Sequence, residues 1–129
     1  MDIVADAGAF IAVALNETER NWVIVRTSEY VVVSPEVLPY EIGNALISVT
    51  RKGRLNDDEV ARAFDISQRI PVRLVAVDIH HAIEIAVRLH IHAYDAYYLQ
   101  CCIENKLPLI SLDVRMCHSA KSLGIEVVE

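Results

Sequence analysis

The sequence alternates short apolar runs, rich in β-branched residues, with longer stretches of helical periodicity. Five of the short runs are predicted strands, at residues 3–5, 30–33, 73–77, 107–111 and 125–128. A helical pattern separates each strand from the next, which favours parallel strands because these need a long crossover connection. The sequence therefore predicts an α/β fold in which helices cover both faces of a five-stranded parallel sheet, in three layers.

Start and stop signals mark the predicted helices. Ser34 and Pro35 resemble the N-cap and the first position of one helix, Pro39 is expected to kink its first turns, and Gly53 marks its end. Another helix is predicted after Asn56, where three acidic residues fill the first turn, and it runs to about residue 69. Five further helices are predicted at residues 7–15, 17–27, 79–89, 94–106 and 114–123.

The length of 129 residues, with no repeat or low-complexity linker, predicts a single domain over residues 1–129. The cysteines are odd in number and Cys101 adjoins Cys102, so buried thiols are expected rather than disulfides or a metal site. No charged leader opens the sequence and no apolar run is long enough to cross a bilayer, so a cytoplasmic location without membrane contact is expected.

The charge and hydropathy of the chain restrict its partners. A formal net charge of -6 excludes binding to nucleic acid through an overall basic field, so any contact with RNA must be local. The mean hydropathy of +0.31 is high and indicates a heavily buried sheet, a surface covered by a partner, or both.

Four carboxylates interrupt apolar runs, unlike most of the 18 acidic residues of the chain. An acid in a polar run is usually solvated, whereas an acid in an apolar run must be desolvated, paired or bound to a metal. The candidate catalytic and metal-binding residues are therefore Asp6, Glu41, Asp95 and Asp113.

The predicted topology brings these four acids together. Asp6 and Asp113 each follow a strand, and Glu41 lies early in the helix that leaves the second strand. Asp95 opens a helix that must run antiparallel to the strands, so all four reach the carboxyl edge of the sheet, where ligands of open α/β sheets bind. A helix cap explains any one of them alone, but capping does not explain four acids at one edge.

Two polar residues accompany the acids. Asn44 lies one helical turn after Glu41, and Ser111 precedes Asp113 by two residues, so each shares a side of its element with an acid. We expect Asn44 and Ser111 to support the acids by hydrogen bonds.

Clustered carboxylates repel one another. Two unit charges about 4 Å apart cost roughly 4 kcal/mol at an effective dielectric constant of ~20, so such a site protonates in part or recruits a cation. All-oxygen ligation suits Mg²⁺ or Mn²⁺, and these ions assist the hydrolysis of phosphate esters. The sequence therefore predicts a metal site that acts on a phosphodiester.

Four segments resemble, in order and across essentially the whole chain, the PIN-domain nucleases: IVADAGAFIAV, PYEIGNALISV, AYDAYYLQC and LISLDVR. Their spacing is most similar to that of the VapC-like toxins of toxin–antitoxin pairs. The resemblance implies an endoribonuclease dependent on Mg²⁺ or Mn²⁺, which cuts RNA, is inhibited by a cognate antitoxin and is commonly a homodimer. The metal-binding acids of the family fall on the four candidate acids, Asn44 matches its E-x-x-N pattern, and Ser111 stands where Thr is usual.

The sequence departs from the family pattern at two positions. Gly8 stands where Ser, Thr or Asn is usual, which removes one hydrogen bond near the metal. Arg115 stands where many members carry a further acid, which argues against a second tightly held metal. A catalytically weak PIN scaffold that binds an antitoxin is therefore one alternative function.

Two other functions are open. A PIN-type nuclease for RNA processing would need no antitoxin. A receiver-like signalling domain has a similar size and topology, but it needs paired acids at the end of the first strand, where this chain has Asp6 followed by Ala7 and Gly8.

Other polar features have simpler structural explanations. The histidines at 80, 81, 90 and 92 lack the partners and spacing of a zinc motif. The basic residues at 51, 52 and 54 could contact RNA, but they also suit a helix C-terminus. The tyrosines at 94, 97 and 98 could stack on bases, but their helical spacing favours packing.

Overall fold

Four strands form one parallel sheet in the computed structural model, which describes residues 1–129. They are β1 (Asp2–Ala5), β2 (Val31–Pro35), β3 (Arg73–Val75) and β4 (Leu109–Ile110), in the order β3-β2-β1-β4. Every pairing is parallel, with Ile3 opposite Val32 and Val4 opposite Leu109. The predicted α/β class with a parallel sheet is confirmed.

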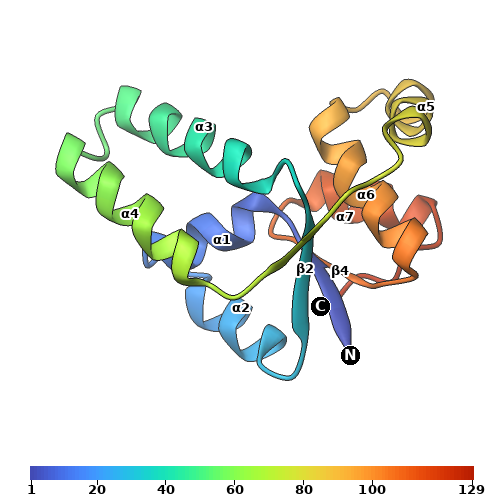
Figure 1. Ribbon diagram of the computed structural model, residues 1–129, viewed down its shortest axis with the longest axis horizontal. Coiled ribbons are helices and arrows are strands. Elements are labelled where there is room, and N and C mark those ends of the chain that lie inside the picture. Colours follow the sequence, from blue (N-terminus) through green and yellow to red (C-terminus); the bar gives the residue numbers. More distant parts are fainter.

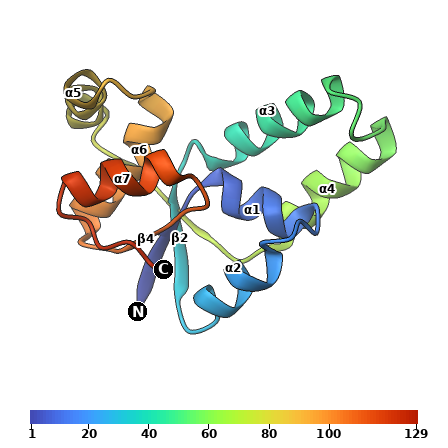
Figure 2. The same cartoon turned by 180° about the vertical axis from the view of Figure 1, so that it is seen from behind.

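Helices cover both faces of the sheet and give the three predicted layers. They are α1 (Ala7–Ala14), α2 (Arg20–Thr27), α3 (Leu38–Arg51), α4 (Asp57–Arg69), α5 (Ile79–Leu89), α6 (Ala93–Asn105) and α7 (Val114–Ser122). Figure 1 and Figure 2 show α1 to α4 on one side of the sheet and α5 to α7 on the other. Both faces of β1 are covered, so Ile3 and Val4 are fully buried in a single core cluster of 25 residues.

The prediction of five strands was wrong. The C-terminal segment 125–128 lies parallel to β4, but only one bridge forms, between Leu109 and Val127. Hydrogen bonds run from Leu109 N to Glu126 O and from Val128 N to Leu109 O, both 2.9 Å long. Because β4 has just two residues, the C-terminal segment cannot form a longer ladder of hydrogen bonds along its outer edge.

The predicted start of the third helix was also wrong. Ser34 and Pro35 end β2, where the Ser34 hydroxyl donates a 2.6 Å hydrogen bond to Ala5 O on the neighbouring strand. Helix α3 begins at Leu38 instead, so Pro39 lies in its first turn, where a missing N–H costs no helical hydrogen bond, and α3 continues unbroken to Arg51.

The predicted C-terminal end of α3 and the predicted start of α4 are confirmed. Gly53 follows α3 with φ of +76°, a left-handed conformation that favours glycine. Asn56 caps α4 by accepting a 2.9 Å hydrogen bond from Glu59 N, and the Glu59 carboxylate accepts one of 3.2 Å from Asn56 N. This capping box fixes the α3–α4 hairpin at one end of the molecule.

The cysteines are free thiols, as expected. Cys101 and Cys102 are buried in α6, and Cys117 is partly buried in α7. Burial raises the pKa of Cys101 to about 11 and that of Cys102 further, so both stay protonated. None of the helices combines the length and the hydropathy that crossing a bilayer requires.

Candidate active site

All four candidate acids line one cavity of about 540 Å³ at the carboxyl edge of the sheet. Asp6 follows β1 and caps α1, and Asp113 follows β4 and caps α7. Glu41 and Asp95 lie in the first turns of α3 and α6. Asn44 also lines the cavity, so the structure brings together five of the six predicted site residues there.

Asp6 is the deepest of the acids, with 7% of its surface exposed. One carboxylate oxygen accepts a 3.2 Å hydrogen bond from Ala9 N, and the other accepts one from the Ser111 hydroxyl. Burial raises the pKa of Asp6 to about 6; the two hydrogen bonds oppose this, while Asp113 and Asp95 add to it.

Ser111, the sixth predicted residue, lies behind the cavity and connects two of its walls. Its hydroxyl donates to Asp6 and accepts a 3.1 Å hydrogen bond from Asp113 N. Asp113 uses one oxygen to cap α7, accepting from Arg115 N at 2.8 Å and Met116 N at 3.3 Å. Ser111 therefore fixes Asp6 relative to the start of α7, and the second Asp113 oxygen stays free of protein donors.

Glu41 and Tyr98 carry buried polar atoms without partners. Glu41 Oε1 and the Tyr98 hydroxyl are both inaccessible to solvent and neither forms a hydrogen bond. Burial raises the pKa of Glu41, and the nearby acids Asp95 and Asp6 raise it further, while the closeness of the Tyr98 hydroxyl lowers it. The two groups are thus neighbours without a hydrogen bond between them, and each keeps one buried polar atom unpaired.

Asp95 completes the electrostatic coupling of the cavity. Burial is the main cause of the raised pKa of Asp95. The charge of Asp113 raises this pKa further, whereas His92 lowers it. Three of the four acids therefore have pKa values raised by burial and by one another, which is the electrostatic state that a bound cation relieves.

The donor set fits a hard divalent cation. The cavity is lined by carboxylates from four places in the fold, two that follow strands and two in the first turns of helices. No three His, Cys, Asp or Glu side chains lie close enough to enclose an ion by themselves. Mg²⁺ keeps several of its waters and takes only one or two carboxylates directly, so its binding does not require such a group.

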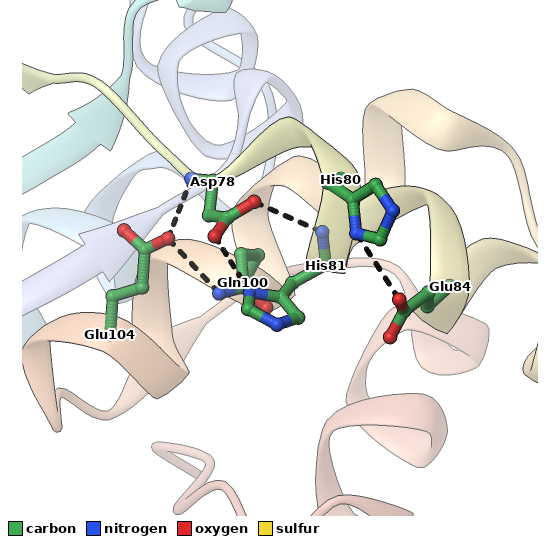
Figure 3. Close-up of polar contacts among 6 residues, drawn as sticks. All are labelled: Asp78, His80, His81, Glu84, Gln100 and Glu104. Atoms are coloured by element: carbon green, nitrogen blue, oxygen red, sulfur yellow. Dashed lines mark hydrogen bonds and ion pairs between the residues drawn. The ribbon is translucent and has the colours of Figure 1, made fainter.

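Two of the histidines pair with acids at the surface. His80 lies 3.2 Å from Glu84 and His81 lies 2.7 Å from Asp78, both pairs exposed on α5 (Figure 3). The same figure shows the Glu104 carboxylate of α6, which accepts hydrogen bonds from Asp78 N at 2.6 Å and Gln100 Nε2 at 3.0 Å. These contacts join the start of α5 to α6, the helix that carries Asp95.

Three polar residues of the cavity were not among the predicted site residues. Glu17 and Glu19 line it from the link between α1 and α2, a segment that was predicted to be helical. Tyr98 lines it from α6, three residues after Asp95 and therefore on the same helix face. That spacing was the available signal for Tyr98, whereas nothing in the sequence distinguished the two glutamates from solvated acids.

Tyr94, Tyr97 and the basic residues at 51, 52 and 54 do not line the acid-lined cavity. Tyr94 and Tyr97 pack edge to face, with ring centroids 6.0 Å apart, and line a separate apolar cavity of about 370 Å³. Arg51, at the far end of α3, is about 15 Å along the helix from Glu41 at ~1.5 Å per residue. The basic residues there suit the helix C-terminus and do not line the cavity.

Comparison with known proteins agrees with the fold. The family model described as PIN domain matches residues 3–122, so the chain belongs to the PIN-domain family, whose members are generally nucleases. The solved structure described as "Crystal structure of PAE2754 from Pyrobaculum aerophilum" is similar, with a TM-score of 0.73 and 22% identity over 99% of this chain and 84% of that chain. At that identity the likeness shows the fold alone. The search of curated proteins found no match.

Proposed function

We propose that this protein is a Mg²⁺-dependent endoribonuclease, with Mn²⁺ as the alternative ion, that hydrolyses RNA phosphodiester bonds at the acid-lined cavity. The observation that carries the proposal is the convergence of Asp6, Glu41, Asp95 and Asp113, from four separate elements, on one cavity of a PIN domain. Without a cation, the acid-lined cavity would repel RNA. A bound cation relieves both this repulsion and the repulsion among the four acids.

The protein residues have distinct roles in this proposal. The four acids would hold Mg²⁺, one or two of them directly and the others through its waters, and the ion would supply stabilisation of the negative charge that develops on the phosphate and a lowered pKa of a bound water. Asp6 orients the site, because Ser111 and Ala9 N hold both of its oxygens. Glu41 lines the cavity and has a raised pKa, so it is suited to accept the proton of the attacking water.

An RNA-cleavage assay tests the activity. Wild-type protein is expected to cut single-stranded RNA with Mg²⁺ or Mn²⁺ and to stop in EDTA, and Asp95→Asn is expected to lose at least 100-fold in rate, about 2.7 kcal/mol of transition-state stabilisation. Asp65→Asn is the matched control, because Asp65 is exposed on α4 and does not line the cavity. Cleavage that survives EDTA, or equal loss in both variants, contradicts the proposal.

We further propose that the nuclease acts in the cytoplasm as the toxin of a toxin–antitoxin pair. The support is the spacing of the four motif segments, which is most similar to that of VapC-like toxins, and an apolar surface suited to a homodimer or an antitoxin. Tyr40, Ile79 and Tyr94 are more than half exposed around the apolar cavity.

Growth of a bacterial host tests the toxin role. Induction of the wild-type chain is expected to arrest growth, Asp95→Asn is expected to be harmless, and coexpression of a short neighbouring gene is expected to restore growth. Active cleavage in vitro without growth arrest would instead favour a PIN nuclease for RNA processing.

A further inference from the structure

A second cavity of about 380 Å³ adjoins the acid-lined one. It lies between the α5–α6 link and the start of α7, and its walls include His90, His92, Arg115 and Ser119. The two cavities share Asp95, Asp113 and Met116 as wall residues. They are therefore two halves of one continuous depression in the surface.

The two cavities differ sharply in charge. The first is lined by six acids and by no Lys, Arg or His, whereas the second has one arginine and two histidines beside the shared Asp95 and Asp113. A strand of RNA carries a phosphate at every nucleotide, so only the phosphate at the acidic cavity can be neutralised by a metal ion there. The phosphates on either side need protein donors.

Arg115 is free to act as such a donor. The chain has four ion pairs, and Arg115 takes part in none of them. Its backbone N–H donates to Asp113, which fixes the start of α7, but its guanidinium has no protein hydrogen-bond partner. A guanidinium matches the geometry of phosphate because it presents parallel N–H donors.

The start of α6 adds further donors beside the same cavity. His92 is the N-cap of this 13-residue helix, and no side chain caps it. The N–H groups of Ala93, Tyr94 and Asp95 therefore donate to no other protein group. His90, in a left-handed conformation with φ of 56°, turns the chain from α5 into this position. Unpaired N–H groups and an arginine together favour an anion.

We propose that the second cavity binds a backbone phosphate of the RNA substrate, adjacent to the phosphodiester that is cut, with Arg115 as the principal contact and His92 as the second. This inference rests on the proposed nuclease function and adds to it a binding residue at a position where acids are usual in the family. With Arg115, the protein contacts the RNA over a longer stretch of backbone than it would through the acid-lined cavity alone.

Steady-state cleavage of single-stranded RNA oligonucleotides tests the contact. Arg115→Gln is expected to raise KM about tenfold and to leave kcat within about twofold, because the contact binds a part of the substrate that does not react. Arg115→Lys is expected to recover part of the affinity, because it keeps the positive charge but lacks the parallel N–H donors of the guanidinium. Arg62→Gln is the control, an exposed arginine without an ion pair on α4, across the sheet from α7.

The salt dependence gives a second expectation. Loss of one phosphate contact on a single strand is expected to lessen the slope of log(kcat/KM) against log[salt] by about 0.7 in Arg115→Gln and to leave it unchanged in Arg62→Gln. Equal changes of KM and of slope in both variants would mean that only the net charge of the protein matters. A fall in kcat with unchanged KM would mean that Arg115 does not act by binding the substrate. Either result overturns the proposal.

Binding without catalysis separates the subsite from the nuclease activity. With Mg²⁺ present, a hydrolysis-resistant phosphorothioate RNA oligonucleotide is expected to shift the NMR signals of the His90 and His92 rings in wild-type protein, and Arg115→Gln is expected to abolish these shifts. Unshifted histidine signals in the wild type overturn the subsite. Histidine shifts in a protein that cuts no RNA with Mg²⁺ would support the subsite and refute the nuclease proposal instead.

Discussion

Substitution of Asp6 by Asn is expected to stabilise the metal-free protein at neutral pH. In the folded protein the pKa of Asp6 is raised from its ordinary value of 3.8 to about 6, chiefly by burial. At about 1.4 kcal/mol per pKa unit, the ionised form then costs about 3 kcal/mol of stability. The substitution removes this cost.

The sign of the pH dependence follows from the same difference. Between about pH 4 and pH 6 the folded protein keeps a proton on Asp6 that the unfolded chain releases. The free energy of unfolding therefore falls as the pH rises through this window, and the full cost is present above about pH 6. At pH 4 the folded Asp6 is protonated, so Asp6→Asn gives no gain there.

The expected gain is smaller than the electrostatic cost. An asparagine whose oxygen keeps the hydrogen bond from Ala9 N presents its NH₂ group to Ser111, so the Ser111 hydroxyl loses its acceptor, which costs about 1 kcal/mol. The net gain at pH 7.5 is then about 1 to 2 kcal/mol, or roughly 4 to 8 °C in Tm.

Denaturation of wild type, Asp6→Asn and the exposed control Asp65→Asn in EDTA, at pH 4 and pH 7.5, measures this difference. Millimolar Mg²⁺ is expected to stabilise the wild type and not Asp6→Asn. The reasoning is refuted if Asp6→Asn lowers the stability at pH 7.5 by 1 kcal/mol or more, or if its effect is the same at both pH values.

Three further stability measurements follow from single contacts. Tyr98→Phe removes a buried hydroxyl that has no partner, so the free energy of unfolding in EDTA is expected to rise by about 1 kcal/mol, and a fall would mean that the hydroxyl is hydrogen-bonded. Asn56→Ala breaks the capping box of α4 and is expected to lower the free energy of unfolding by about 1 kcal/mol. Asp58→Asn, in the same turn, is expected to give a smaller loss. Gly8→Ala is expected to raise it by about 0.5 kcal/mol, because the new Cβ would lie 3.6 Å from Asp6 Oδ1 and meet no closer atom; a loss would show that this space is needed.

The sequence by itself determined the fold class and the meeting of the acids. Alternating strands and helices require parallel pairing, and parallel strands share one carboxyl edge. Asp6 and Asp113 follow strands β1 and β4, and Asp95 begins an antiparallel helix, so each had to reach that edge. The capping box at Asn56 was equally readable, because its partners are three residues apart.

Tertiary contacts decided the rest, because the groups involved are distant in the chain. Ser34 and Pro35 have the local pattern of a helix start, but the bond from Ser34 to Ala5 O and the pairing of β2 with β3 keep them in a strand. The fifth strand was lost because β4 has just two residues to pair with. The burial of Tyr98 beside Glu41, and the cavity that joins Arg115 to the α5–α6 link, depend on how α6 and α7 pack, and packing between distant segments leaves no local pattern in the sequence.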